Sequence, residues 1–93
     1  MNEVQKNKVI ENLTLNLPTL RTKANLTQVK LSEMIGVSRQ TLVAIENEKR
    51  KMSWNTFLSC LLVFQKNPET NQLLKIYNIA TDELENYLES TGK

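Results

Sequence analysis

The chain has 93 residues, of which 40% are hydrophobic and 24% charged, and this length suits one small domain. It has one cysteine and no histidine, which excludes a disulfide framework and a zinc finger. The formal net charge is only +2, but residues 1–66 hold ten Lys and Arg against five Asp and Glu, whereas residues 67–93 hold two against five.

Two helices are predicted at the N-terminal end, in a chain whose apolar spacing lacks strand-like alternation and therefore favours an all-α bundle. The first covers about residues 4–15, where an extended segment is the alternative. Residues 16–18, Asn-Leu-Pro, then form a helix start, because proline is tolerated in the first turn of a helix. This second helix runs to Ala24 and carries Arg21 beside its inner face.

Two short helices joined by a tight turn follow. Thr27 is a good N-cap for a helix over residues 28–35, which ends at Gly36, the residue best able to adopt a positive φ. Ser38 caps the next helix, over residues 39–47, whose start is polar and faces outward. Two helices with such a turn form the helix-turn-helix plan, and the second helix is of the kind that reaches base edges in a major groove.

The remaining helices are marked by their caps and by proline. After the basic loop at residues 48–51, Ser53 caps a helix over 54–65, which is apolar nearly all round and is expected to be the most buried element. Pro68 starts a fifth helix at a permitted position, and Thr81 caps a sixth.

These elements predict a compact helical bundle with a central part and two flanking parts. Residues 16–66 form the helix-turn-helix core, residues 1–15 form the N-terminal helix or extended segment, and residues 67–93 form the C-terminal helices, a possible dimerisation segment. Residues 90–93 are expected to fray.

The sequence LTQVKLSEMIGVSRQTLVAIENEKRK, residues 26–51, resembles the Cro/C1-type (XRE-like) helix-turn-helix domains of bacterial and phage transcriptional regulators. The likeness covers roughly residues 17–64. It implies a fold of the lambda-repressor-like type and sequence-specific binding to double-stranded DNA by a small, repressor-like regulator. The second helix of the motif would then lie in the major groove.

Three residues depart from the pattern of that family. Ser32 stands where alanine is usual, and Val29 stands where an acidic residue is usual. Glu48 stands where glycine is common after the asparagine. At this position, either Asn47 adopts the left-handed conformation or the helix continues for another turn.

The candidate base-reading residues lie on the outer face of the second motif helix: Ser38, Arg39, Gln40, Thr41, Val43 and Ala44. A cation at a helix N-terminus opposes the helix dipole, so helix stability does not account for Arg39. Arginine fits guanine O6 and N7, glutamine fits adenine N6 and N7, and Val43 would suit a thymine methyl group. The alternative is a solvated first turn with no contact to DNA.

The candidate phosphate contacts are Gln28, Asn47, Lys49, Arg50 and Lys51. The resemblance implies that Gln28 bonds a phosphate at a helix N-terminus, where amides and dipole favour an anion, and that the loop clamps the backbone. Without the resemblance, Gln28 would be interpreted as a solvated surface amide. The loop cations would then be explained by their favourable interaction with the dipole at the C-terminal end of the preceding helix. The resemblance also implies a structural ion pair between Arg21 and Glu46.

Catalysis is not expected from this set of residues. The acids are scattered, no histidine is present, and Cys60 has no plausible base and is interpreted as a buried small apolar residue. The sequence also lacks a glycine-rich phosphate loop, so we expect no enzymatic activity, no cofactor and no metal ion. The N-terminal residues lack the apolar core of a signal peptide and no apolar run can span a bilayer, so a cytoplasmic location is expected.

A homodimer is the expected form, because one recognition helix covers few base pairs and useful specificity requires two half-sites. The interface is predicted after Pro68, with Tyr77 and Leu84 near its centre. The apolar residues considered for this interface are Leu73, Leu74, Tyr77, Leu84, Tyr87 and Leu88. Two alternatives stay open: these residues close the protein's own core, or they bind a protein partner, as in an antitoxin-like or adaptor module.

Overall fold

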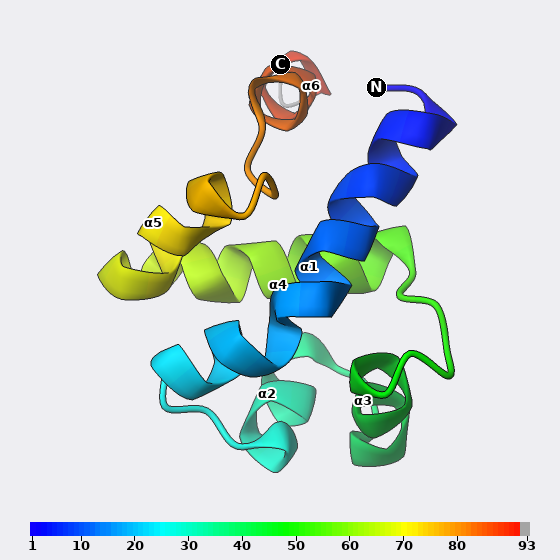
Figure 1. Ribbon diagram of the computed structural model, residues 1–93, viewed down its shortest axis with the longest axis vertical. Helices are drawn as coiled ribbons and strands as arrows, with labels where there is room; N and C mark the ends of the chain where they lie inside the picture. Colours follow the sequence, from blue (N-terminus) through cyan, green and yellow to red (C-terminus); the bar gives the residue numbers. More distant parts are fainter. Residues whose placement is uncertain (92–93) are drawn as a thin grey trace.

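The computed structural model describes residues 1–91, and within them the chain forms helices and no strand (Figure 1). The six helices are α1 (Glu3–Lys23), α2 (Gln28–Ile35), α3 (Arg39–Glu46), α4 (Trp54–Lys66), α5 (Pro68–Ile76) and α6 (Asp82–Thr91). In Figure 1, α4 crosses the middle of the molecule, α2 and α3 lie below it, and α6 lies above. The prediction of an all-α bundle is confirmed.

Helix starts follow the caps that the sequence predicts. The Oγ atoms of Thr27, Ser38 and Ser53 each accept a bond from the backbone N–H three residues later, at 3.0–3.1 Å. Thr81 does the same for α6 at 3.2 Å. Each of these bonds satisfies a backbone donor that has no partner within its own helix. Gly36 has a φ of 74° and ends α2 in the left-handed conformation, as predicted.

The N-terminal region is one helix and not two, so the predicted helix start at residues 16–18 is wrong. Helix α1 continues through Pro18, although an interior proline costs a helix about 3 kcal/mol. The helix is held together because Leu13, Leu17 and Leu20, spaced along one face, are all fully buried. Figure 1 shows that α1 bends along its length, as a helix with an interior proline does. The expected boundary between residues 15 and 16 lies inside this helix.

The end of α3 differs from both alternatives that the sequence suggested. Asn47 has a φ of −87°, and the helix itself ends at Glu46. The left-handed residue is Glu48, with a φ of 59°. The N–H of Lys49 then bonds the carbonyl of Ala44 at 2.9 Å, which completes a Schellman motif.

Helix α4 lies at the centre of the core and contacts α1, α2 and α5. Its buried residues are Phe57, Cys60, Leu61 and Phe64. Leu62 on the other side remains 58% exposed, so the apolar residues that α4 carries nearly all round are not buried on every side. No helix among the described residues is long and apolar enough to cross a membrane.

The C-terminal helices pack back onto the core. Leu74 and Leu84 are fully buried, and Leu73, Tyr77 and Leu88 are partly buried against the same cluster. A side chain with no exposed surface is not at the centre of an intermolecular interface, so the prediction for Leu84 is wrong. Its apolar surface is buried within its own chain, as the first of the two open alternatives held.

Helix α6 also corrects the expectation for the C-terminus. It runs to Thr91, so Ser90 is helical rather than frayed, and its hydroxyl donates to the carbonyl of Asn86 at 2.6 Å. The other residues for which fraying was expected, 92 and 93, lie outside the described residues.

Candidate nucleic-acid interface

Helix α3 presents its polar face to solvent and its apolar face to the core. Leu42 and Ile45 are buried, whereas Arg39 and Gln40 in the first turn are exposed. The residues around one depression of this surface are Arg39, Gln40, Val43, Ala44, Asn47 and Lys49. The fold therefore brings four of the candidate base-reading residues together with two of the candidate phosphate contacts.

Ser38 and Thr41 are used differently from the other candidate residues of this helix. The Ser38 Oγ accepts the Thr41 N–H at 3.0 Å and donates to the Thr41 Oγ1 at 2.9 Å. Neither residue lines the depression. Their hydroxyl groups fix the backbone at the start of α3. They therefore also fix the direction in which the side chains of Arg39 and Gln40 extend from the helix.

Arg21 and Glu46 form the ion pair that the sequence resemblance implied. The Arg21 Nε lies 2.8 Å from Glu46 Oε2, and its Nη2 lies 3.2 Å from Glu46 Oε1. The two side chains are only 18% and 6% exposed, so removal of one partner would leave a largely desolvated charge. Arg21 Nη1 also donates to the carbonyl of Leu26 at 3.1 Å. This network joins α1, the connection to α2, and the end of α3.

Gln28 belongs to the same network, which the sequence did not indicate. Its Nε2 donates to Glu46 Oε1 at 3.0 Å, and the side chain is half-buried at the first turn of α2. Eighteen residues separate the two partners, so neither helical spacing nor composition signals the contact. The amide nitrogen has a second hydrogen, which leaves it able to serve a further acceptor such as a phosphate.

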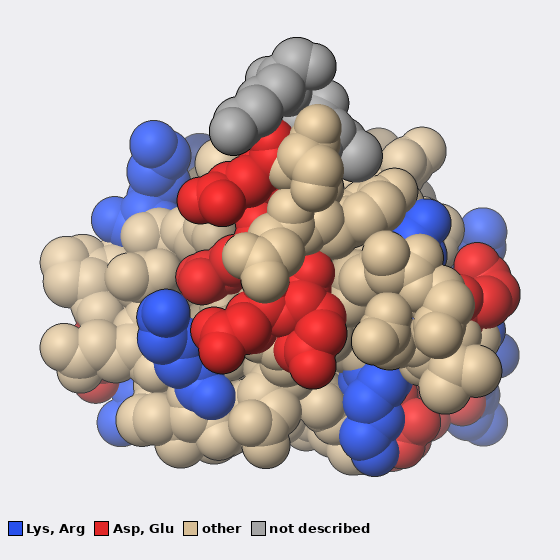
Figure 2. Space-filling model, turned by 90° about the horizontal axis from the view of Figure 1, so that it is seen from above, with Lys and Arg blue, Asp and Glu red and all other residues tan. Residues whose placement is uncertain are grey.

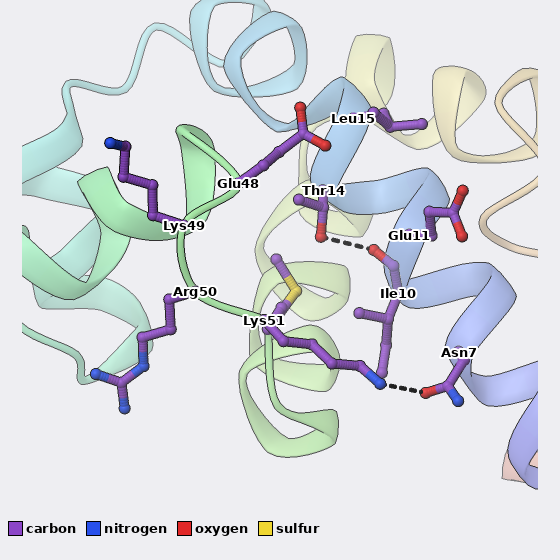
Figure 3. Close-up of a pocket in the computed structure, with 10 residues that line it drawn as sticks. Asn7, Ile10, Glu11, Thr14, Leu15, Glu48, Lys49, Arg50 and Lys51 are labelled. Carbon is purple, nitrogen blue, oxygen red and sulfur yellow. Dashed lines mark hydrogen bonds between the residues drawn. The ribbon is translucent and has the colours of Figure 1, made fainter.

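The three cations of the loop between α3 and α4 do not all point in the same direction. Figure 3 shows Lys49 and Arg50 pointing away from α1, whereas Lys51 points toward it. The Lys51 Nζ donates to the Asn7 Oδ1 at 2.9 Å. All three cations are exposed, but the structure does not gather them on one side of the loop. Asn7 is a contact of the basic loop that sequence reasoning missed, because 44 residues separate it from Lys51.

Acidic side chains gather at the end of the molecule that is distant from α3. Figure 2 looks onto this end and shows them at the centre of the face. Helix α6, which lies there in Figure 1, carries Asp82, Glu83, Glu85 and Glu89. DNA approaching this end would be repelled, whereas α3 with Arg39, Lys49 and Arg50 lies at the opposite end.

Cys60 lies in the core and not at this surface. Burial, with a smaller effect from the nearby charge of Glu46, raises the pKa of its thiol from 9.0 to about 12. The thiol is therefore protonated at neutral pH and is not a nucleophile.

These features together define a helix-turn-helix protein: two short helices joined by a glycine turn, with the second presenting a polar face outside a helical core. In a comparison with protein families, the helix-turn-helix family of the Cro/C1 (XRE-like) type matches residues 19–69, more than half of the chain. The chain belongs to this family of DNA-binding helix-turn-helix regulators. Searches of curated proteins and of solved structures gave no match.

Proposed function

We propose that the protein is a small transcriptional regulator that binds a specific sequence of double-stranded DNA with α3 in the major groove. The depression on α3 carries this proposal, because Arg39, Gln40 and Lys49 line it together. An arginine and a glutamine in the exposed first turn of such a helix match the donors and acceptors of guanine and adenine. A cation at the edge of the same surface matches the phosphates beside those bases.

The proposed contacts divide into base-reading and positioning groups. Arg39 and Gln40 read bases, and Val43, half-buried one turn further along, rests against a thymine methyl group. Gln28 and the basic loop, with Lys49 and Arg50, position the domain on phosphates, since Gln28 lies against Glu46 at the end of α3, next to that loop. In the free protein Glu46 holds Gln28 in place, so its amide does not have to be ordered when DNA binds.

We further propose that the protein acts by occupying its DNA site, as a repressor does, and not by catalysis. The single thiol of the chain is buried with a pKa raised to about 12, which removes its strongest potential nucleophile. A role as an antitoxin or adaptor has less support, because Leu74 and Leu84, which would bind the partner, are buried within the chain.

The proposal includes a homodimer on two half-sites about one helical turn apart. One recognition helix as short as α3, with eight residues, contacts too few base pairs for a useful specificity. The segment after Pro68 can contribute only the residues it leaves at the surface, and among its large hydrophobic residues Ile76 is 67% exposed. Sedimentation at micromolar concentration, with and without DNA, tests the dimer, and a monomer in both conditions would refute it.

Selection of bound duplexes from a random pool tests the DNA-binding proposal as a whole. The wild-type chain should enrich an inverted repeat whose half-sites are centred about 10 base pairs apart. An Arg39→Ala variant in parallel should lose the preference at one position of each half-site. If no sequence is enriched by the folded wild-type chain, sequence-specific binding is excluded.

A further inference from the structure

Helix α1 begins well before the region that matches the family. The match starts at residue 19, whereas α1 starts at Glu3. The N-terminal part of α1, residues 3–14, lies beside the loop that joins α3 to α4 (Figure 3). This loop carries the cations of the proposed phosphate contact, so the additional helix turns lie next to the proposed interface.

The far end of the loop is attached to this part of α1 at two adjacent residues. Lys51 donates to the Asn7 Oδ1 at 2.9 Å. The Nζ of Lys6 lies 5.0 Å from the ring centre of Trp54, the first residue of α4, a distance typical of a cation–π contact. Between these attachments, Met52 is only 1% exposed. The backbone from residue 51 to residue 54 is therefore fixed against α1.

The near end of the loop is fixed by the Schellman motif at the end of α3. The N–H groups of Glu48 and Lys49 bond the carbonyls of Ile45 and Ala44 at 3.0 and 2.9 Å. With both ends held, the side chains of Lys49 and Arg50 extend from the loop on the side away from α1 (Figure 3). Lys49 also lines the depression on α3.

We propose that Asn7 is a positioning residue for DNA binding: it holds Lys51 against α1 and so fixes the loop that presents Lys49 and Arg50 to phosphates. This inference rests on the proposed DNA binding and divides the three loop cations into two kinds. Lys49 and Arg50 contact phosphates, and Lys51 supports the loop. A loop ordered before binding loses less conformational entropy when DNA binds, which strengthens the complex without an added contact.

The dependence of affinity on salt separates the two kinds of cation, because each cation on a phosphate contributes about 0.9 to the slope of log K against log salt. We would measure it with the full chain on a duplex enriched from the random pool. Lys49→Ala and Arg50→Ala should each reduce the slope by about 0.9 per bound subunit, or about 1.8 for a dimer on both half-sites, whereas Lys51→Ala and Asn7→Ala should leave it unchanged. Lys8→Ala, which removes an exposed cation on the other side of α1, is the matched control and should change neither slope nor affinity.

The affinities at one salt concentration show whether Asn7 and Lys51 act together. The bond joins exposed groups, so Asn7→Ala and Lys51→Ala should each weaken binding roughly two- to fivefold per bound subunit. The double variant should be no weaker than either single variant, and Lys51→Arg, which can still reach Asn7, should bind as the wild type does. The inference would be overturned, while DNA binding stands, by two results together. Lys51→Ala would reduce the salt slope as much as Lys49→Ala does, and Asn7→Ala would bind with the affinity of the wild type. A wild-type chain without salt-dependent binding would refute the proposed function itself.

Discussion

Replacing Glu48 by glycine should stabilise the protein. Glu48 has a φ of 59°, in the left-handed region where a side chain with a Cβ costs roughly 1–2 kcal/mol. Glycine avoids this cost but adds conformational freedom to the unfolded chain, worth roughly 0.5–1 kcal/mol. The difference is roughly 0–1.5 kcal/mol in favour of the glycine variant, and its central value of about 0.75 kcal/mol corresponds to a rise in Tm of about 3–6 °C for a domain of this size.

Two further variants at Glu48 separate backbone conformation from charge. Glu48→Asn should also stabilise the fold, because asparagine tolerates the left-handed region better than most residues. Glu48→Gln keeps the unfavourable backbone and removes only the charge, so its stability should stay within about 0.5 kcal/mol of the wild type. Thermal and urea unfolding of the variants in one buffer measures these differences. A Glu48→Gly variant no more stable than Glu48→Gln would refute the argument from backbone conformation.

The same variants change DNA binding for a different reason. Glu48 is next to Lys49, and although its side chain points toward α1 in Figure 3, phosphates within a Debye length of about 8–10 Å of its carboxylate would be repelled. Glu48→Gly and Glu48→Gln should therefore bind DNA more tightly than the wild type, and to a similar extent. The difference between them should appear in unfolding and not in binding. Binding unchanged in both variants would mean that this end of α3 lies away from the phosphates.

Three further predictions concern the network, the base contacts and the core. In urea unfolding, Arg21→Ala should lower the free energy of unfolding by about 3 kcal/mol, because it leaves the buried Glu46 carboxylate without its cation. The control Lys23→Ala removes an exposed pair and should change the free energy of unfolding by less than about 1 kcal/mol. Arg39→Ala and Gln40→Ala should each weaken binding to the selected site by about 1–3 kcal/mol and relax the preference for one base, as measured by binding to single-base variants of the site. The raised pKa of Cys60 should lower the free energy of unfolding as pH rises from 9.0 toward about 12, because in that range the thiol ionises only in the unfolded chain. In unfolding experiments over this pH range, a Cys60→Ala variant should lack this contribution to the loss of stability.

Local signals in the sequence predicted the helix starts because each start depends on neighbouring residues. Thr27, Ser38 and Ser53 cap their helices by accepting a bond from the backbone N–H three residues later, and short-range sequence patterns capture such a contact. The same local reasoning failed at Pro18, where the rule for proline predicted a helix start. The burial of Leu13, Leu17 and Leu20 on one face is a tertiary effect, and it outweighs the local preference.

Contacts between distant residues were predicted only where the family resemblance supplied them. Arg21 and Glu46, 25 residues apart, were paired by resemblance and not by spacing. Gln28 joins the same carboxylate and was not predicted to do so, because an amide at a first helix turn reads equally well as a solvent-exposed group. Lys51 was grouped with the other loop cations because they are adjacent in sequence. Its side chain instead reaches a part of α1 outside the family match.

The small net charge does not count against DNA binding, because the positions of the charges matter more than their sum. The longest dimension of the molecule is 33 Å, and in Figure 1 this axis runs from α6 at the top to α2 and α3 at the bottom. Charges in physiological salt are screened beyond a Debye length of about 8–10 Å. The acids of α6 therefore have little effect on phosphates bound at α3, and a net charge of +2 understates the positive field there. Among the acids close to that surface, Glu46 is already neutralised by Arg21. Glu48 forms no ion pair within the described residues, which is why its replacement is expected to change affinity.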